Sequence, residues 1–197
     1  MFYDTGSNAH GLRHDPVKAL VAPRPIGWIS TIGRDGGVNL APYSFFNLVS
    51  EHPPYVMFSS SGRKHSQRNA EETGEFVCSL ATFALREQMN ASSAAVPYGV
   101  DEFALAGIAT AQSRLVKPPR VAASPAALEC RHWQTVTPPT RGREPYSIII
   151  GEVVAVYIDD RFIADGMVDT VAMQPIARMG YMDYAVVDKK FVMRRPK

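Results

Sequence analysis

Two short polar clusters in the sequence combine residue types that bind small ligands. The first runs from Asn39 to Asn47 (NLAPYSFFN), where amides, hydroxyls and aromatic rings alternate. A planar ligand needs this mixture, because its polar edge takes hydrogen bonds and its faces take apolar walls. Pro42 lacks a backbone N–H and keeps the segment from being a central strand. The same pattern also fits an irregular core loop whose rings simply pack, and the segment alone favours neither interpretation.

The second cluster is Ser59 to Ser66 (SSSGRKHS), which ends a predicted strand and opens a predicted helix. Hydroxyls, two fixed cations and the free N–H groups of a helix start are the groups that bind a phosphate monoester. Taken alone, such a run is more often a solvated turn with an ordinary N-cap. The two clusters together are more informative than either one.

Other polar side chains carry weaker signals. Ser30 and Thr31, at the end of the first predicted strand, could add polar contacts or could simply be exposed strand residues. Asp101 and Glu102 have no base or nucleophile near them in the sequence, so we interpret them as solvated loop charges. No acid or base role is assigned.

The sequence lacks the fingerprints of several other site classes. It has no Gly-x-Gly-x-x-Gly or Gly-x-x-x-x-Gly-Lys-Ser/Thr segment, and no Gly-x-Ser-x-Gly, His-Glu-x-x-His or Cys-x-x-Cys segment. His10 and His14 lie four residues apart in a Gly-containing stretch, which we interpret as a surface pair rather than as metal ligands. We therefore predict no metal site and leave the catalytic residues unassigned.

The elements that position these clusters are mostly strands. Six segments show strand composition or alternation: residues 26–32, 38–40, 55–59, 75–80, 126–136 and 147–158. Leu128 and Cys130 alternate with Glu129 and Arg131, the period of a half-buried strand. Gly151 is placed where the last strand could bulge or bend.

Helices are few in the predicted pattern. Residues 66–73 are compatible with a helix that has Ser66 as N-cap and Gly74 as its stop, and a second helix is predicted over residues 82–92. Leu85 and Met89 lie on one face of the second helix. Because strands and helices do not alternate regularly, we predict a mainly β fold, a closed or partly closed antiparallel β-barrel with peripheral helices.

Bulk composition bounds the class of protein. The chain has 197 residues, 46% of them hydrophobic, which suits one domain with a continuous core. We expect an N-terminal arm at residues 1–16, the domain at residues 17–187 and a C-terminal tail at residues 188–197. The scattered charges sum to only +2, which argues against nucleic acid as a partner. Cys78 and Cys130 lie in apolar stretches, and the chain shows no secretion signal and no membrane-length apolar run, so we expect a soluble, cytoplasmic protein.

An ordered series of segments resembles one known family. The stretches PRPIGWIST (from Pro23), NLAPYSFFN (from Asn39) and Pro53-Pro54 are similar to the opening of the flavin reductase-like, FMN-binding split-barrel family, which includes flavoredoxin and the reductase components of two-component monooxygenases. The similarity continues through Lys64 to Asn69, Gly74-Glu75-Phe76, Asp101-Glu102-Phe103, Ala106-Gly107, Ala127 to Cys130, Ile150 to Val153 and Ala177 to Gly180. It spans residues 17–184 approximately, and the ordered series is more specific than any single piece.

The resemblance implies a split β-barrel that works as a homodimer, with one non-covalent FMN per subunit in a groove near the subunit interface. By matching position, the implied contacts with the ring or the ribityl chain are Ser30, Thr31, Asn39, Ala41, Pro42, Tyr43, Ser44 and Asn47. The implied contacts with the phosphate are Ser59, Ser60, Lys64 and Ser66, and Arg178 and Tyr181 close the site. NADH or NADPH is the implied electron donor, and a monooxygenase or another protein is the implied acceptor.

Two departures from the family pattern bear on function. Many relatives have an acidic residue and then Thr after the lysine, where this chain has His65 and Ser66, and His65 could add a pH-dependent charge near the phosphate. The stretch around Asp101 is more similar to flavoredoxin. The leading hypothesis is an NAD(P)H:flavin reductase, and the alternative is a flavoredoxin-like electron carrier that does not oxidise NAD(P)H. A third hypothesis is a dimeric binding module that has lost the flavin.

Overall fold

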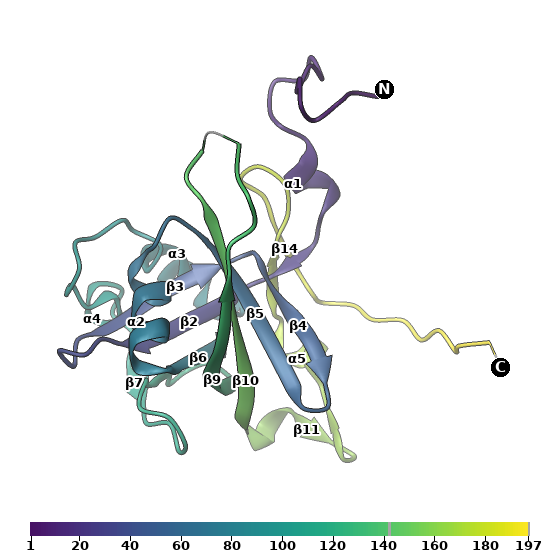
Figure 1. The fold of residues 1–197 in the computed structure, drawn as a ribbon. Coiled ribbons are helices and arrows are strands. Elements are labelled where there is room, and N and C mark those ends of the chain that lie inside the picture. The colour runs from purple at the N-terminus through teal and green to yellow at the C-terminus, as the bar shows by residue number, and fades with distance from the viewer. Residues whose placement is uncertain (142, 197) are drawn as a thin grey trace.

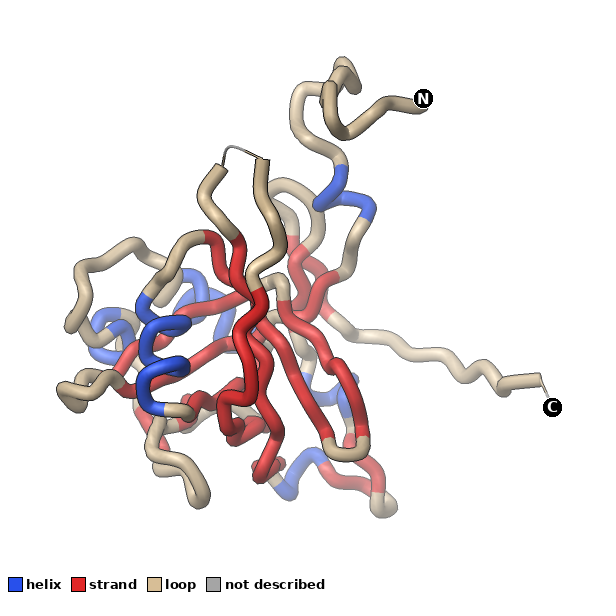
Figure 2. The backbone as a smooth tube through the Cα atoms, in the orientation of Figure 1, coloured by secondary structure: helices blue, strands red, loops and turns tan. Residues whose placement is uncertain are grey.

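The computed structural model describes residues 1–141 and 143–196, and a seven-stranded antiparallel sheet dominates it (Figure 1). In spatial order its strands are β3 (Val38–Tyr43), β2 (Gly27–Ile32), β6 (Glu75–Leu80), β9 (Ala126–Val136), β10 (Tyr146–Ile158), β5 (Pro54–Ser61) and β4 (Phe46–Glu51). Helices lie at the periphery of the strands (Figure 2). The predicted mainly β fold is therefore confirmed, and every predicted strand is present.

The two edges of the sheet meet at one corner. β3 and β4 are the edge strands, and the chain passes between them through Ser44 and Phe45 alone. The Ser59 N–H donates to the Phe45 carbonyl at 2.8 Å, which ties this corner to β5. Pro42 lies in the edge strand β3, as its missing N–H predicts. The sequence analysis ended β3 too early, at residue 40, and did not predict β4.

Apolar side chains pack on both sides of the sheet. Inside the barrel, Phe58 and Phe76 are fully buried, with their ring centroids 5.4 Å apart. Gly151 makes this possible, because a Cβ there would lie 2.4 Å from the Phe76 ring. The register of β9 and β10 shifts at Ile150/Gly151, which confirms the predicted irregularity. A second cluster surrounds Trp28, whose indole Nε1–H donates to Ser92 Oγ at 2.9 Å.

Three helical segments flank the barrel. α2 (His65–Thr73) begins one residue earlier than predicted, and its N-cap is Lys64 rather than Ser66; it ends at Gly74, whose φ of 77° is left-handed. The predicted helix over residues 82–92 is divided into a 3₁₀ turn, η1 (Phe83–Leu85), and α3 (Arg86–Ala91). The Phe83 N–H donates to the Gln174 carbonyl at 2.9 Å, so this segment starts as a bridge to the C-terminal part rather than as a regular helix.

The burial of Glu129 contradicts the alternation predicted for β9. It is only 4% exposed, although the pattern placed it on the polar face. Its carboxylate accepts the N–H groups of Arg114 and Leu115 at 2.8 and 2.7 Å. The loop that covers this face thus supplies the hydrogen bonds that a buried carboxylate needs.

The remaining elements are short. A three-stranded sheet joins the two ends of the chain and contains β1 (Arg24–Pro25), β13 (Ile176–Arg178) and β14 (Tyr184–Val186). The others are α1 (Val17–Leu20), α4 (Glu102–Leu105), β7 (Thr110–Ala111), β8 (Arg120–Val121), η2 (Asp160–Phe162), β11 (Ile163–Ala164), β12 (Met167–Val168) and α5 (Thr170–Met173). Residues before α1 and residues 188–196 extend away from the body (Figure 1). No helix within residues 1–141 and 143–196 is long and apolar enough to cross a membrane.

Candidate functional site

A trough of two compartments runs along the corner between β3 and β5. The compartments meet at Pro42, Tyr43 and Lys64, which line both. The helix compartment has a volume of about 390 Å³ and is also lined by Asn39, Ala41, Arg63, His65, Ser66, Ser92, Ser93, Ala94, Ala95, Val96 and Glu102. The arginine compartment has a volume of about 260 Å³ and is also lined by Lys18, Arg24, Ser44, Phe45, Ser59, Ser60, Ser61, Arg178 and Tyr181.

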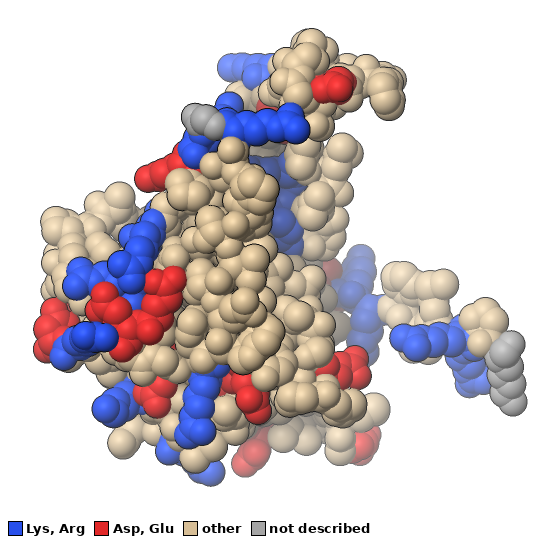
Figure 3. Space-filling model, viewed as in Figure 1, with Lys and Arg blue, Asp and Glu red and all other residues tan. Residues whose placement is uncertain are grey.

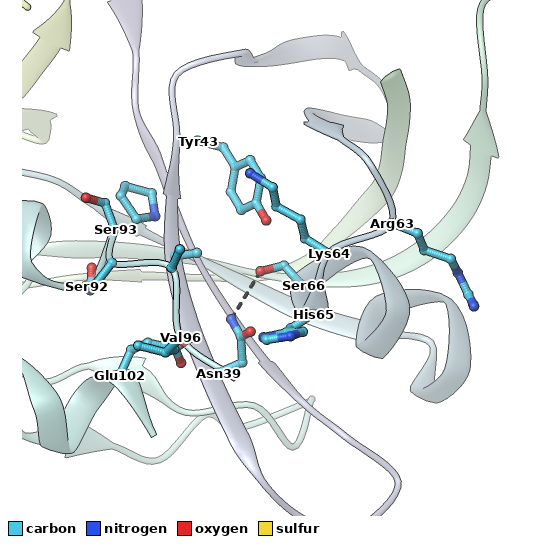
Figure 4. A pocket seen from close by; sticks show the side chains of 14 residues that line it. Asn39, Tyr43, Arg63, Lys64, His65, Ser66, Ser92, Ser93, Val96 and Glu102 are labelled. Atoms are coloured by element: carbon cyan, nitrogen blue, oxygen red, sulfur yellow. Dashed lines mark hydrogen bonds between the residues drawn. The ribbon is translucent and has the colours of Figure 1, made fainter. Parts of the chain in front are cut away.

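The helix compartment contains the start of α2. Among the described residues, no side chain caps this helix. No capping side chain therefore accepts a hydrogen bond from the N–H groups of its first turn. Asn39 Nδ2 donates to Ser66 Oγ at 3.1 Å, and Lys64 extends toward Tyr43 (Figure 4). Arg63 points away from these side chains and pairs with Glu71 at 2.9 Å (Figure 4). Lys64 is therefore the fixed cation that this end of the trough offers to an anion.

Glu102 forms part of the opposite wall. It is 4% exposed, and one carboxylate oxygen accepts the Leu40 N–H at 3.0 Å. Burial raises the pKa of Glu102, while the Leu40 hydrogen bond and the His65 charge oppose the rise. Our prediction that Asp101 and Glu102 are solvated loop charges is wrong. Asp101 caps α4 by accepting the Phe103 N–H at 2.8 Å, and this cap turns Glu102 into the fold.

Tyr43 separates the two compartments. Its ring packs on Phe58 with centroids 4.8 Å apart, so the barrel core fixes its position. Burial raises the pKa of the Tyr43 hydroxyl, and the hydroxyls of Ser66 and Ser60 oppose that rise. Ser66 belongs to the helix compartment and Ser60 to the arginine compartment. Tyr43 thus presents a flat ring and one polar atom between the two ends of the trough.

The arginine compartment is built by segments far apart in the sequence. Arg24 is 8% exposed, and its guanidinium donates to the carbonyls of Lys18 and Val21 at 2.5 Å each and to the Met179 carbonyl at 2.7 Å. Arg178 donates to the Tyr181 carbonyl at 2.6 Å and to the Tyr184 hydroxyl. Burial and the nearby Arg178 charge lower the pKa of Arg24. Lys and Arg side chains gather where the N-terminal arm joins the body (Figure 3).

Most of the predicted site residues line the trough. Those that do are Asn39, Ala41, Pro42, Tyr43, Ser44, Ser59, Ser60, Lys64, Ser66, Arg178 and Tyr181. The residues predicted around a phosphate are divided, however, because Ser59 and Ser60 lie in the arginine compartment and Ser66 in the helix compartment. Lys64 borders both.

Three predicted residues lie away from the trough lining. Ser30 is buried and donates to the Pro119 carbonyl at 2.5 Å. Thr31 is buried and accepts from Asn69 Nδ2 at 3.1 Å, so both hydroxyls are used inside the fold. Asn47 is exposed on β4, where its side-chain oxygen accepts the Leu48 N–H at 2.8 Å. The structure does not bring these three into the candidate site.

Sequence reasoning missed several lining residues. Lys18 and Arg24 lie before the predicted barrel, and only the tertiary fold brings them to Ser59 and Arg178. The loop at residues 92–96 consists of two serines and three small apolar residues, without a ligand-binding signal of its own. The burial of Glu102 could have been predicted from its neighbours. Asp101 is a typical N-cap residue, and the apolar Phe103 two residues later predicts a helix start that packs against the core. Within the described residues, no group of three His, Cys, Asp or Glu side chains could hold a metal ion.

Comparisons with known proteins converge on one family. The sequence model of the flavin reductase like domain matches residues 20–171. An uncharacterized protein of Deinococcus radiodurans is 40% identical over 190 residues, which cover 90% of this chain and 82% of the relative. An uncharacterized protein of Aquifex aeolicus is 35% identical over 170 residues, covering 83% and 84% of the two chains.

Solved structures share the whole fold. Nitrilotriacetate monooxygenase component B from Bacillus cereus has a TM-score of 0.90 at 25% identity, with 98% of each chain covered. The flavoredoxin of Desulfovibrio vulgaris has a TM-score of 0.79 at 21% identity, with 94% of this chain and 95% of that chain covered. The split barrel is therefore the architecture of this chain.

Proposed function

Because this chain belongs to the flavin reductase-like domain family, we propose that it is a flavoprotein oxidoreductase that binds FMN non-covalently in the trough. We further propose that NADH or NADPH reduces the flavin, and that reduced flavin or its electrons pass to an acceptor. The observation that carries the proposal is the junction at Lys64 and Tyr43, where an anion-binding helix start meets a flat aromatic wall.

The residues present fit the two chemical parts of FMN. Lys64, the N–H groups at the start of α2 and the Ser66 hydroxyl are suited to the phosphate, because a helix start concentrates donors and partial positive charge. Pro42 and Tyr43 supply apolar surface for the planar ring. Ser59 and Ser60 supply hydroxyls for its polar atoms or for the ribityl chain. Ala94 to Val96 add small apolar walls on the far side.

When bound, FMN supplies a ring that accepts hydride and releases electrons. The chain's own part is to bind, to orient and to keep water out. Tyr43 is held by Phe58 and sets the plane against which a ring can stack. Because hydride transfer depends chiefly on alignment, no side chain needs to move a proton for the donor to react.

The proposal that NAD(P)H is the electron donor rests on the family to which the chain belongs. Nitrilotriacetate monooxygenase component B, which shares the fold at a TM-score of 0.90, is named as part of a monooxygenase system. Such a system is consistent with a flavin reductase that serves a second protein. The free, buried cysteines Cys78 and Cys130 are consistent with the reducing cytoplasm in which nicotinamide cofactors are kept reduced.

We also propose that the chain forms a homodimer through the outer side of β4. Leu48 and Val49 on this edge strand are 52% and 54% exposed, and Trp133 on β9 is 60% exposed. An exposed apolar edge strand invites pairing with another chain, and a second copy presents the complementary surface. Sedimentation of the purified protein at several concentrations measures the mass of the particle in solution. A monomer at every concentration would contradict the proposed dimer.

The absorption spectrum of purified protein, incubated with FMN and desalted, tests the central proposal. We expect retained flavin bands that bleach when NADH or NADPH is added without oxygen. Bands that persist until dithionite is added would replace the reductase by an electron carrier of the flavoredoxin kind. Failure to retain any flavin would overturn FMN binding and favour a binding module for another ligand. Lys117→Gln is the matched control, because Lys117 lies on a different surface, and this variant should retain FMN as the unmodified chain does.

A further inference from the structure

The arginine compartment holds an excess of positive charge that the fold does not neutralise. Lys18, Arg24, Lys64 and Arg178 line it, and no Asp or Glu is among its lining residues. Among the described residues, none of these four side chains takes part in an ion pair. Four cations around a cavity of about 260 Å³ create a strong attraction for an anion.

The two arginines are held in place by neutral groups. Within the part of the chain that the structure describes, Arg24 donates only to backbone carbonyls, and its buried Nε has no hydrogen-bond partner. The Arg178 guanidinium lies 4.5 Å from the centroid of the Tyr184 ring and also donates to a carbonyl. Burial, and then repulsion from the nearby Arg178 guanidinium, lower the pKa of Arg24. A buried, unpaired donor beside a second fixed cation indicates that a ligand completes the cluster.

The helix compartment has a different charge balance. Arg63 is neutralised there by Glu71 at 2.9 Å, and Glu102 forms part of the wall. Lys64 and the start of α2 already provide for one phosphate monoester. One FMN carries one such group, so its phosphate does not account for the cations beyond Tyr43.

We propose that Arg178, Arg24 and Lys18 form a second anion subsite, which binds the phosphate or carboxylate group of the small molecule that exchanges electrons with the flavin. This proposal rests on the proposed function, because it places the second molecule next to the ring. Two sources share the chemistry: the pyrophosphate of a nicotinamide dinucleotide and the carboxylate of an acidic electron acceptor. Arg178 is suited to either, since a guanidinium binds both groups through a planar pair of donors.

Calorimetric titration with inorganic pyrophosphate tests the subsite without any turnover. We expect the chain alone to bind pyrophosphate at two sites and the FMN-loaded chain to retain one. Arg178→Gln should weaken the retained site by about 10-fold or more, because a charge-assisted bidentate contact is lost. Arg178→Lys should restore part of the affinity, and Lys18→Gln should lower it by about threefold, as expected for a more exposed cation. Lys117→Gln, which removes a cation from a different surface, should change nothing.

Several outcomes would overturn the subsite. If FMN abolishes pyrophosphate binding, or if Arg178→Gln and Lys18→Gln leave it unchanged, the arginine cluster is not a separate site. If FMN itself does not bind, the proposed function fails, and the subsite is still decided by whether Arg178→Gln removes one of the two pyrophosphate sites. Circular dichroism confirms that Arg178→Gln folds, and Lys18→Gln carries the test if it does not. Displacement of pyrophosphate by ADP-ribose identifies the dinucleotide as the source, and displacement by benzoate identifies an acidic acceptor.

Discussion

The two compartments of the trough use their cations in different ways. At the arginine end, Arg24 binds three backbone carbonyls and holds segments from both ends of the chain. At the helix end, the Lys64 ammonium has no hydrogen bond or ion pair among the described residues. Within the described part of the chain, Arg24 is therefore tied into the folded framework and keeps only its Nε for a ligand, while all the donors of the Lys64 ammonium are free for one. Residue type alone does not reveal this difference, because both are basic residues lining one trough.

The largest expected effect is on stability, and it comes from Arg24. Arg24→Met leaves three carbonyl acceptors without their charged donor, so we expect the free energy of unfolding to fall by about 3 kcal/mol. Urea denaturation followed by circular dichroism measures the change. Lys64→Met is the matched control and should alter stability by less than about 0.5 kcal/mol. Equal losses in the two variants would remove the distinction between the two cations.

The complementary effect is on ligand affinity. Lys64→Gln should weaken FMN binding by about 10- to 100-fold, the range of about 1.5–3 kcal/mol for a hydrogen bond to a charged group. Quenching of FMN fluorescence on titration with protein gives the dissociation constant. An unchanged constant would show that the phosphate does not lie at the start of α2.

A smaller effect is expected where the compartments meet. Tyr43→Phe keeps the ring on Phe58 and removes the hydroxyl beside Ser60 and Ser66. We expect FMN affinity to fall by about fivefold, equivalent to one neutral hydrogen bond of about 1 kcal/mol. Tyr43→Ala, which also removes the ring, should cost clearly more. If the two substitutions weaken FMN equally, the ring does not form the wall of the site.

The smallest expected effect is a change in the pH dependence of stability. Burial is the first cause of the raised Glu102 pKa, so the folded state holds its proton more tightly than the unfolded state. Below its ordinary pKa of 4.5, Glu102 is protonated in both states and does not lower the free energy of unfolding. As pH rises from 4.5 to the raised folded-state pKa, the free energy of unfolding falls, and above that pKa the loss is constant. Glu102→Gln should flatten the unfolding free energy over this range, and urea melts from pH 4.5 upward measure it. An unaltered slope would assign the pH dependence to other groups.

Local pattern predicted the barrel better than it predicted the site. β6 and β9 match the predicted ranges residue for residue, because turn residues flank them and apolar residues recur along them. β4 was missed, since Phe46 to Glu51 is exposed over most of its length and lacks the alternation of a strand with one buried face. The alternation of residues along a strand predicts on which face of the sheet a side chain lies, but not whether a loop covers that face. The prediction therefore placed Glu129 on an exposed face.

The site shows the same limit. The contiguous clusters around Tyr43 and Lys64 could be found from sequence, because each lies on one strand and the segment after it. Ser30 and Thr31 had suitable chemistry, but their hydroxyls bond Pro119 and Asn69, which no local pattern connects with them. The sequence predicts no role for Arg24, since its partners lie at residues 18, 21 and 179.

The Arg24 contact with Met179 also has a consequence for folding kinetics. It joins residues 155 positions apart in a chain of 197, so it encloses most of the chain. Closing such a long loop in the unfolded chain costs conformational entropy, and the cost falls once the intervening strands have paired and brought the two ends close together. We therefore expect the arginine end of the trough to assemble after the barrel, late on the folding pathway. A ligand that requires both ends of the trough would then recognise only chains that have completed folding.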